Sequence, residues 1–315
     1  GACVPSHPIS TGAAMPITKL EQILETVKSR PRKRLVAAWA NDSHTVAAVG
    51  EAVGLGLIEA TLVGDETAIR ATCQAEKLDP AKVTIVHETS DVRASARAVA
   101  MVNAGEAQIL MKGLVSSDKY MRAILDKEKG LMDPGAILSH VTVIEVASYP
   151  KLIVCGDVAV LPAPELKEKI ALTNYYIATA HALGIEKPKV AIIAATEQMS
   201  YKMQACVDAA IISKMADRGG IKGALVDGPL ALDVAVDREA VEIKGLKSPV
   251  AGDADVLVFP SIEAGNVFYK TCTKLAGAEL AGLVVGARVP CVLTSRGDTA
   301  KSKLYSIGLA ALMAK

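Results

Sequence analysis

Short polar segments that follow apolar runs mark the places where this sequence could do chemistry. Near the C-terminus, the apolar run 289–294 gives way to Ser295, Arg296, Gly297 and Asp298, and a helical pattern follows. An arginine can hold a phosphate with two parallel hydrogen bonds, and the amide groups at the start of a helix also favour an anion. The segment therefore predicts an anion-binding turn. The structural alternative is that Ser295 or Asp298 only caps the helix, with Arg296 in water.

A second segment, MKGLVSSDKYMR (111–122), has the same organisation of an apolar run, a polar turn and a helix. Exposed amide groups at the start of that helix would again favour an anion. The candidate ligands are Lys112, Ser116, Ser117 and Arg122. The structural alternative is a capped helix start with Asp118 and Arg122 paired four residues apart on an exposed face. The residues of this segment alone slightly favour that alternative.

Two further turns follow apolar runs in the second half of the chain. One contains Gly265, Asn266 and Lys270, and the other contains Asp227 and Asp233. Each turn is weak evidence when taken alone. Because the carboxyl ends of parallel strands meet at one edge of a sheet, we expect all four turns to line a common crevice.

The elements that carry these turns alternate between apolar runs and helical patterns. Residues 15–30 place four apolar side chains on one helix face, and four strand-then-helix units follow between residues 34 and 130. Region 131–165 contains strand-like runs without helices between them, which predicts an antiparallel segment and the entry to a second domain. The alternation then resumes. This pattern predicts an α/β protein with parallel-rich sheets flanked by helices.

Composition excludes several classes of protein. The 315 residues are 51% hydrophobic but only 3% aromatic, which suits strands buried on both faces. The formal net charge of +1 provides no basic field for a nucleic acid, and no apolar run is long enough to span a bilayer.

The cysteines and histidines give no sign of a metal site or of disulfides. The six cysteines are scattered, and the five histidines lack metal-ligand spacing, so we expect no metal and free thiols in a cytoplasmic protein. Residues 1–14 lack periodicity, and we expect them to be an extension or a tag.

Several segments together resemble the phosphate acetyl/butyryl transferase family. They are KGLVSSDKYMRAIL, CGDVAVLPAPELKEKI, DGPLALDVAV and the long segment FPSIEAGNVFYKTCTKLAGAELAGLVVGARVPCVLTSRGD. The resemblance runs from about Met15 to the C-terminus. The stretch SHVTVIEV and the ending SRGDTAKSKLYSIGLA are more similar to the butyryltransferase branch than to the acetyltransferase branch.

The resemblance implies a fold like that of isocitrate and isopropylmalate dehydrogenases, with a cleft between two α/β domains. The implied domains are 15–134 plus 288–315, and 135–287. It also implies acyl transfer between coenzyme A (CoA) and phosphate (butanoyl-CoA + phosphate ⇌ butanoyl phosphate + CoA) in a ternary complex, without a cofactor. We expect a homo-oligomer, a dimer or larger, without nucleic-acid or membrane partners.

By the same resemblance, specific positions take specific roles. The family's catalytic Ser-Arg pair falls on Ser295 and Arg296, and its substrate-binding positions fall on Arg122, Gly265, Asn266 and Lys270. The anion-binding segment described above adds Lys112, Ser116 and Ser117 as substrate ligands, and Asp298 is added as a third catalytic candidate. One departure concerns the base: acetyl-type members have an aspartate seven residues after the serine, where this chain has Ser302. Asp298 is the nearest carboxylate, and whether it acts as the base is left open.

Three alternative functions remain beside the butyryltransferase. The first is a phosphate acetyltransferase, and the second is a non-catalytic relative that binds acyl-CoA. The third is an NAD-dependent decarboxylating dehydrogenase of the same fold, which would need a metal-binding aspartate cluster that the sequence does not display.

Overall fold

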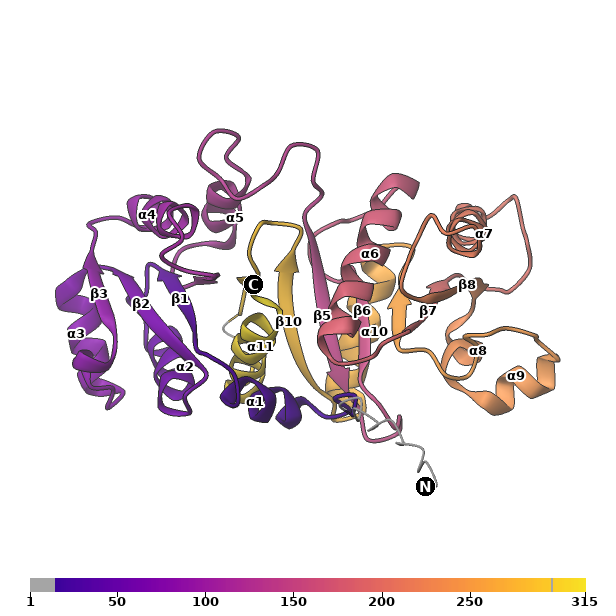
Figure 1. Ribbon diagram of the computed structural model, residues 1–315, viewed down its shortest axis with the longest axis horizontal. Helices are drawn as coiled ribbons and strands as arrows, with labels where there is room; N and C mark the ends of the chain where they lie inside the picture. Colours follow the sequence, from indigo (N-terminus) through magenta and orange to yellow (C-terminus); the bar gives the residue numbers. More distant parts are fainter. Residues whose placement is uncertain (1–14, 296) are drawn as a thin grey trace, which may run out of the picture.

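A single mixed sheet runs through the whole molecule. The computed structural model describes residues 15–295 and 297–315, so the expectation for residues 1–14 lies outside the described residues. The sheet has 11 strands in the order β3-β2-β1-β4-β11-β10-β5-β6-β9-β7-β8, and helices cover both of its faces (Figure 1). The predicted α/β class is confirmed.

The first half of the chain forms the repeated strand–helix units that the sequence predicts. Helix α1 (Leu20–Lys28) precedes them, and the units comprise β1 (Lys33–Ala38), α2 (Ser43–Gly54), β2 (Ile58–Gly64), α3 (Glu66–Ala75), the short 3-10 helix η1 (Pro80–Lys82), β3 (Thr84–His87), α4 (Asp91–Asn103), β4 (Ile109–Lys112) and α5 (Ser117–Leu125). Strands β1 to β4 pair in parallel. Side chains at the helix starts accept amide hydrogen bonds, Asp42 for α2 and Ser116 for α5, which fixes where each helix begins.

The second half begins with the predicted antiparallel segment. Its elements are β5 (Ser139–Glu145), β6 (Ile153–Gly156), α6 (Leu166–Ala182), β7 (Lys189–Ile193), α7 (Gln204–Asp217), β8 (Leu225–Leu230), α8 (Leu232–Val236), α9 (Arg238–Lys244), β9 (Val256–Val258), α10 (Ile262–Leu275), β10 (Glu279–Val285), β11 (Cys291–Val292) and α11 (Ala300–Met313). Strand β5 pairs antiparallel with both β10 and β6, which confirms the expectation for this region.

The reversal of strand direction in this region contradicts the prediction that all four polar turns line a common crevice. Strands β6 to β9 are parallel to one another but run opposite to β1–β4, because β5 runs in the direction of β4 and β6 is antiparallel to β5. The turns after β8 and β9 therefore lie at the other edge of the sheet from the turns after β4 and β11. The segment of β8 and α8 with Asp227 and Asp233 does not line the same space as the other turns, whereas α10 brings Lys270 back to a groove that Ser295 and Asp298 also line.

The hydrophobic core is divided by the sheet. Alternate residues of β1 point to opposite faces, Leu35 and Ala37 to one and Val36 and Ala38 to the other. One face packs against α1, α2, α3, α6, α7 and α11. The other face is covered by α4 and α5 over the first strands and by α8, α9 and α10 over the second group.

The sheet is interrupted where β11 lies between β4 and β10. Strand β11 has only two residues and pairs with β10 at a single position, so this edge of β10 from Leu280 to Gly282 has no strand partner among residues 15–295 and 297–315. Helix α11 supplies two hydrogen bonds to this edge: the Gly282 amide donates to Ser306 Oγ (3.0 Å), and Ser302 Oγ donates to the Leu280 carbonyl (3.0 Å). A gap in the sheet is thereby kept open at low energetic cost.

The division into two domains remains a prediction. The strands of residues 15–134, together with β11, form one flank of the sheet, and the strands between residues 139 and 285 form the other. The C-terminal strand and helix return to the first flank, where α11 packs on α1 and α2 (Figure 1).

Asp157 fixes the loop that follows β6. It is 1% exposed, and its carboxylate oxygens accept five hydrogen bonds of 2.8–3.2 Å. The donors are the Ser139 hydroxyl and the amides of His140, Ala159, Val160 and Leu161. One buried charge thus joins the start of β5 to loop 157–161.

We predict that Asp157→Asn lowers the free energy of unfolding by about 2–4 kcal/mol, because the asparagine NH₂ group would face buried amide donors that now bond to oxygen. Chemical denaturation followed by circular dichroism measures the change. The matched control is Asp126→Asn, since Asp126 is exposed and only its Oδ1 accepts, from the amides of Glu128 and Lys129. The asparagine oxygen can accept both of these hydrogen bonds, so the free energy of unfolding of the control should change little. Equal effects of the two substitutions would contradict the prediction.

Candidate active site

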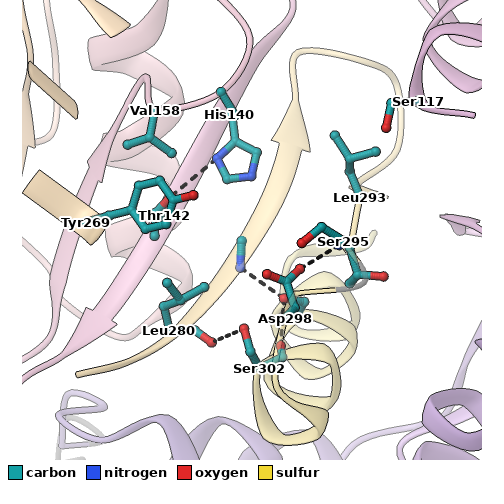
Figure 2. Close-up of a pocket in the computed structure, with 14 residues that line it drawn as sticks. Ser117, His140, Thr142, Val158, Tyr269, Leu280, Leu293, Ser295, Asp298 and Ser302 are labelled. Atoms are coloured by element: carbon teal, nitrogen blue, oxygen red, sulfur yellow. Dashed lines mark hydrogen bonds between the residues drawn. The ribbon is translucent and has the colours of Figure 1, made fainter. Parts of the chain in front are cut away.

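A cavity of about 190 Å³ lies at the gap in the sheet. Its lining comes from β5, β10, α10, the start of α5, loop 157–161 and the segment from Leu293 to Ser306 (Figure 2). The polar lining residues are Ser117, His140, Thr142, Tyr269, Thr294, Ser295, Asp298, Ser302 and Ser306. Residues distant in the sequence thus meet around one small space.

One wall is the turn that follows β11. The Ser295 amide donates to Asp298 Oδ2 (2.7 Å), and the Asp298 amide donates to the Ser295 carbonyl (3.1 Å), so the two residues close a tight turn. Ser295 is exposed and Asp298 is half-buried. The structural alternative, in which Ser295 or Asp298 caps the last helix, is wrong. Thr299 is the cap, and its hydroxyl accepts from the Ser302 amide (3.0 Å).

Arg296 lies outside the described residues, so its role as a phosphate ligand remains a prediction. Ser302, where the resemblance implies an aspartate in acetyl-type members, lines the cavity with its hydroxyl bonded to the Leu280 carbonyl. Asp298 lines the same cavity. The Asp298 carboxylate and the Ser302 hydroxyl therefore border the same cavity.

The opposite wall carries His140 and Thr142 on β5 (Figure 2). His140 is 8% exposed, and its Nδ1 lies 3.3 Å from Thr142 Oγ1. Burial lowers the pKa of the imidazole, whereas the charges of Asp157 and Asp298 act in the opposite direction. Gly282 leaves room for the ring, because a Cβ at that position would lie only 2.9 Å from His140 Cε1.

Helix α10 brings Tyr269 to the cavity and supports loop 157–161. The helix is 14 residues long, so its later turns reach back across the sheet from the far edge. Burial and the charge of Asp298 raise the pKa of Tyr269. Near the start of the helix, Gly265 packs so closely that an added Cβ would lie 2.5 Å from the Asp157 carbonyl, and Asn266 Nδ2 donates to the Val158 carbonyl (3.3 Å). The predicted residues Gly265 and Asn266 therefore hold the loop that lines the cavity.

An outer groove of about 770 Å³ adjoins the cavity. The two spaces share Tyr269, Leu280, Ser295, Asp298 and Ser302, and the outer groove also carries three lysines, Lys270, Lys274 and Lys301. Lys301 pairs with Glu279 at 3.5 Å, and Lys270 Nζ lies 5.9 Å from the centre of the Tyr269 ring. The predicted residue Lys270 thus borders a cationic approach to the cavity.

The predicted residues around α5 separate into two groups. Ser117 lines the cavity, while Ser116 caps the helix through its bond to the Lys119 amide (3.3 Å). Lys112 ends β4, and its Nζ donates to the Gly113 carbonyl (3.1 Å). Arg122 pairs with Asp118 at 3.0 Å, with 78% of its side chain exposed, and it borders a groove between α4 and α5 instead.

Reasoning from the sequence assigned no role to His140, Tyr269 or Lys303. Lys303 is 6% exposed and borders a third hollow, of about 290 Å³, together with Asp298 and His44. Within the described part of the chain its ammonium has no ion pair or hydrogen bond. Only the stretch SHVTVIEV, used above to separate two branches of a family, pointed to His140.

Among the described residues, neither a set of metal ligands nor a cysteine side chain lies at this site. In residues 15–295 and 297–315, no group of three or more His, Cys, Asp or Glu side chains is placed to hold a metal ion. The described cysteines do not line the cavity, and burial raises the pKa of Cys291 to about 12.

None of the helices in the described ranges has the length and apolarity needed to cross a membrane.

The lowered pKa of His140 predicts a specific pH dependence of stability. Because the folded-state pKa lies below the ordinary value of 6.5, the unfolded chain binds this proton before the folded protein does. The stability contributed by the neutral imidazole is therefore complete above that ordinary value and is lost as the pH falls through the folded-state pKa. Unfolding of the wild type and of His140→Gln, compared from about pH 8 to about pH 5, should show the wild type losing more stability. Parallel curves would contradict the prediction.

Comparison with known proteins places the chain in a family. The family model described as phosphate acetyl/butaryl transferase matches residues 89–311. A phosphate butyryltransferase of Clostridium acetobutylicum is 44% identical over 95% of this chain and 99% of its own length, and a phosphate acetyltransferase of Thermotoga maritima is 40% identical over 94% and 99%. The crystal structure of a branched-chain phosphotransacylase from Enterococcus faecalis superposes with a TM-score of 0.78 at 30% identity, covering 89% of this chain and 98% of that one. The chain belongs to the phosphate acetyl/butaryl transferase family.

Proposed function

We propose that this protein is an acyltransferase that moves a short acyl group between CoA and inorganic phosphate. In the butanoyl case the reaction is butanoyl-CoA + phosphate ⇌ butanoyl phosphate + CoA. The observation that carries the proposal is the small cavity that Ser295 and Asp298 line, which opens into a groove with lysines. The named activities of the relatives at 44% and 40% identity support the same reaction.

The two adjoining spaces fit the two ends of CoA. CoA carries several negatively charged phosphates at one end and a thiol at the other. The outer groove offers Lys270 and Lys274 to the phosphates, as point charges that need no fixed geometry. The thiol and its acyl group would enter the cavity, where inorganic phosphate binds beside them in a ternary complex.

Asp298 is the proposed base for the thiol. A thiol with a free pKa of about 8.5 is mostly protonated at neutral pH, so a nearby proton acceptor increases its nucleophilicity. The bond from the Ser295 amide to Oδ2 holds the carboxylate at the cavity wall, and Oδ1 has no hydrogen-bond partner among residues 15–295 and 297–315. Arg296 is proposed to hold the phosphate, with Ser295 beside it. Much of the acceleration then comes from holding two substrates together.

The apolar part of the lining favours an acyl chain longer than acetyl. Val158, Leu280 and Leu293 border the cavity beside the polar residues. Each methylene transferred from water to such surroundings contributes about 0.8 kcal/mol. The phosphate acetyltransferase activity remains the alternative, because a relative of that name is 40% identical. A non-catalytic protein that binds acyl-CoA is a further alternative.

No cofactor enters this proposal, because both substrates supply their own reacting groups. The proposed partners are CoA or acyl-CoA and phosphate or acyl phosphate, without nucleic acid or membrane. We also propose a cytoplasmic homo-oligomer, a dimer or larger.

Asp298→Asn should lower kcat for acyl phosphate and CoA by about a hundredfold or more, because asparagine cannot take the thiol proton. The loss should shrink at high pH, where the thiol ionises without help. Thiol consumption measured across a pH series follows both effects. Asparagine Oδ1 can still accept from the Ser295 amide, so the unfolding temperature should change little. A variant with normal kcat at neutral pH would exclude Asp298 as the base.

The kcat/KM for butanoyl-CoA should exceed that for acetyl-CoA by roughly tenfold, because burying two more methylenes in the cavity stabilises the transition state. Phosphate-dependent thiol release from both thioesters measures the ratio. Leu293→Phe provides a structural control, because a larger side chain in the cavity should reduce turnover of butanoyl-CoA more than that of acetyl-CoA. Equal values for both thioesters in the wild type would favour the acetyltransferase alternative, and no release from either would favour the non-catalytic one.

A further inference from the structure

His140 has a polar atom that its own surroundings leave unused. The imidazole Nδ1 lies 3.3 Å from Thr142 Oγ1, whereas Nε2 has no hydrogen-bond partner among residues 15–295 and 297–315. The residue is 8% exposed, and it lines the cavity opposite Asp298 (Figure 2). A ring nitrogen that has no protein partner, on a side chain that lines a cavity, is available to a bound molecule.

Thr142 decides which form of the ring the fold favours. Thr142 is 1% exposed, and Nδ1 of His140 is the hydrogen-bond partner of its hydroxyl. If Nδ1 carried the proton, the hydroxyl hydrogen would remain buried without an acceptor, which costs about 1–3 kcal/mol. If the hydroxyl donates to Nδ1 instead, both groups are satisfied. The neutral ring then carries its proton on Nε2, the nitrogen left for the cavity.

We propose that His140 donates a hydrogen bond from Nε2 to the acyl oxygen as that oxygen gains negative charge. The proposal rests on the acyl transfer proposed above. The CoA sulfur forms a bond to the acyl carbon, and the π electrons of the carbonyl move onto its oxygen, which accepts the bond from Nε2–H. The carbonyl then re-forms, and the bond to the phosphate oxygen breaks with its electron pair on the departing phosphate.

The proton balance of this step leaves His140 unchanged. The thiol proton moves to the Asp298 carboxylate and afterwards to the departing phosphate or to water. Asp298 is neutral while it holds that proton, so it does not repel the negative oxygen that forms at the same time. A neutral imidazole suits this role, because it donates a hydrogen bond without a charge to desolvate. Low exposure strengthens the interaction, since little water competes for the oxygen.

The ring depends on Gly282 for its position. A Cβ at residue 282 would lie 2.9 Å from Cε1 and 3.1 Å from Nε2 of His140. Gly282 itself is held by the bond from its amide to Ser306 Oγ. The unpaired edge of β10 thus provides the space in which the donor lies.

Two variants of similar size test the donor. His140→Leu removes it, and kcat for acyl transfer should fall by about 100- to 1,000-fold with KM for CoA nearly unchanged. His140→Gln places an amide N–H close to the position of Nε2, and kcat should stay within about tenfold of the wild type. A leucine variant with normal kcat, or a glutamine variant as slow as the leucine one, would overturn the proposal.

The protonation of the His140 ring can be measured directly in the wild-type protein, and this measurement does not depend on turnover. Nitrogen-15 NMR of histidine-labelled protein near neutral pH should show a His140 ring protonated at Nε2 only, assigned by the signal missing in His140→Gln. Thr142→Val should shift the ring toward the Nδ1–H form. A wild-type ring protonated at Nδ1, or at both nitrogens, would overturn the proposal. Absence of acyl transfer in the wild type would count against the proposed function, while the ring spectrum still decides whether a donor faces the cavity.

Discussion

The short strand β11 is the constraint on which the candidate site depends. Had β11 continued along β10, backbone pairing would have closed the sheet between β4 and β10 and left no cavity. Instead the edge of β10 is satisfied by Ser302 and Ser306, and the chain after Val292 is free to form the turn with Ser295 and Asp298. In this sheet of 11 strands, two serine hydroxyls therefore replace strand pairing for the Gly282 amide and the Leu280 carbonyl at the gap.

A second support lies on the other side of the cavity. The Asp157 carboxylate joins the amino end of β5 to loop 157–161, and the close approach of Gly265 and the amide of Asn266 hold the same loop from α10. These contacts position His140 and Val158 without touching the cavity themselves. Their effect on activity would come through geometry, which is why residues such as Gly265 and Asn266 belong to the site although they line none of its surface.

The two walls offer complementary chemistry. One presents a carboxylate that can accept a proton, and the other presents a ring whose proton faces inward in the form that Thr142 favours. In the proposed reaction, a proton would pass to the carboxylate while negative charge grows on the acyl oxygen near the ring, so the charge of the site would change little during the step. A cavity with a half-buried carboxylate on one side and a nearly buried imidazole on the other keeps such interactions strong, because little water screens them.

The sequence by itself determined the local elements, the α/β class and the family. Periodicity located α1, the polar residues of segment 111–122 indicated a capped helix start for α5, and the segment after β11 was identifiable by its residue types. Only the tertiary structure decided that β6–β9 run opposite to β1–β4, that Thr299 and not Asp298 caps α11, and that His140 and Tyr269 face Asp298. Strand direction, the choice between adjacent caps and contacts across the sheet depend on pairings between distant residues, and a single sequence carries no local signal for them.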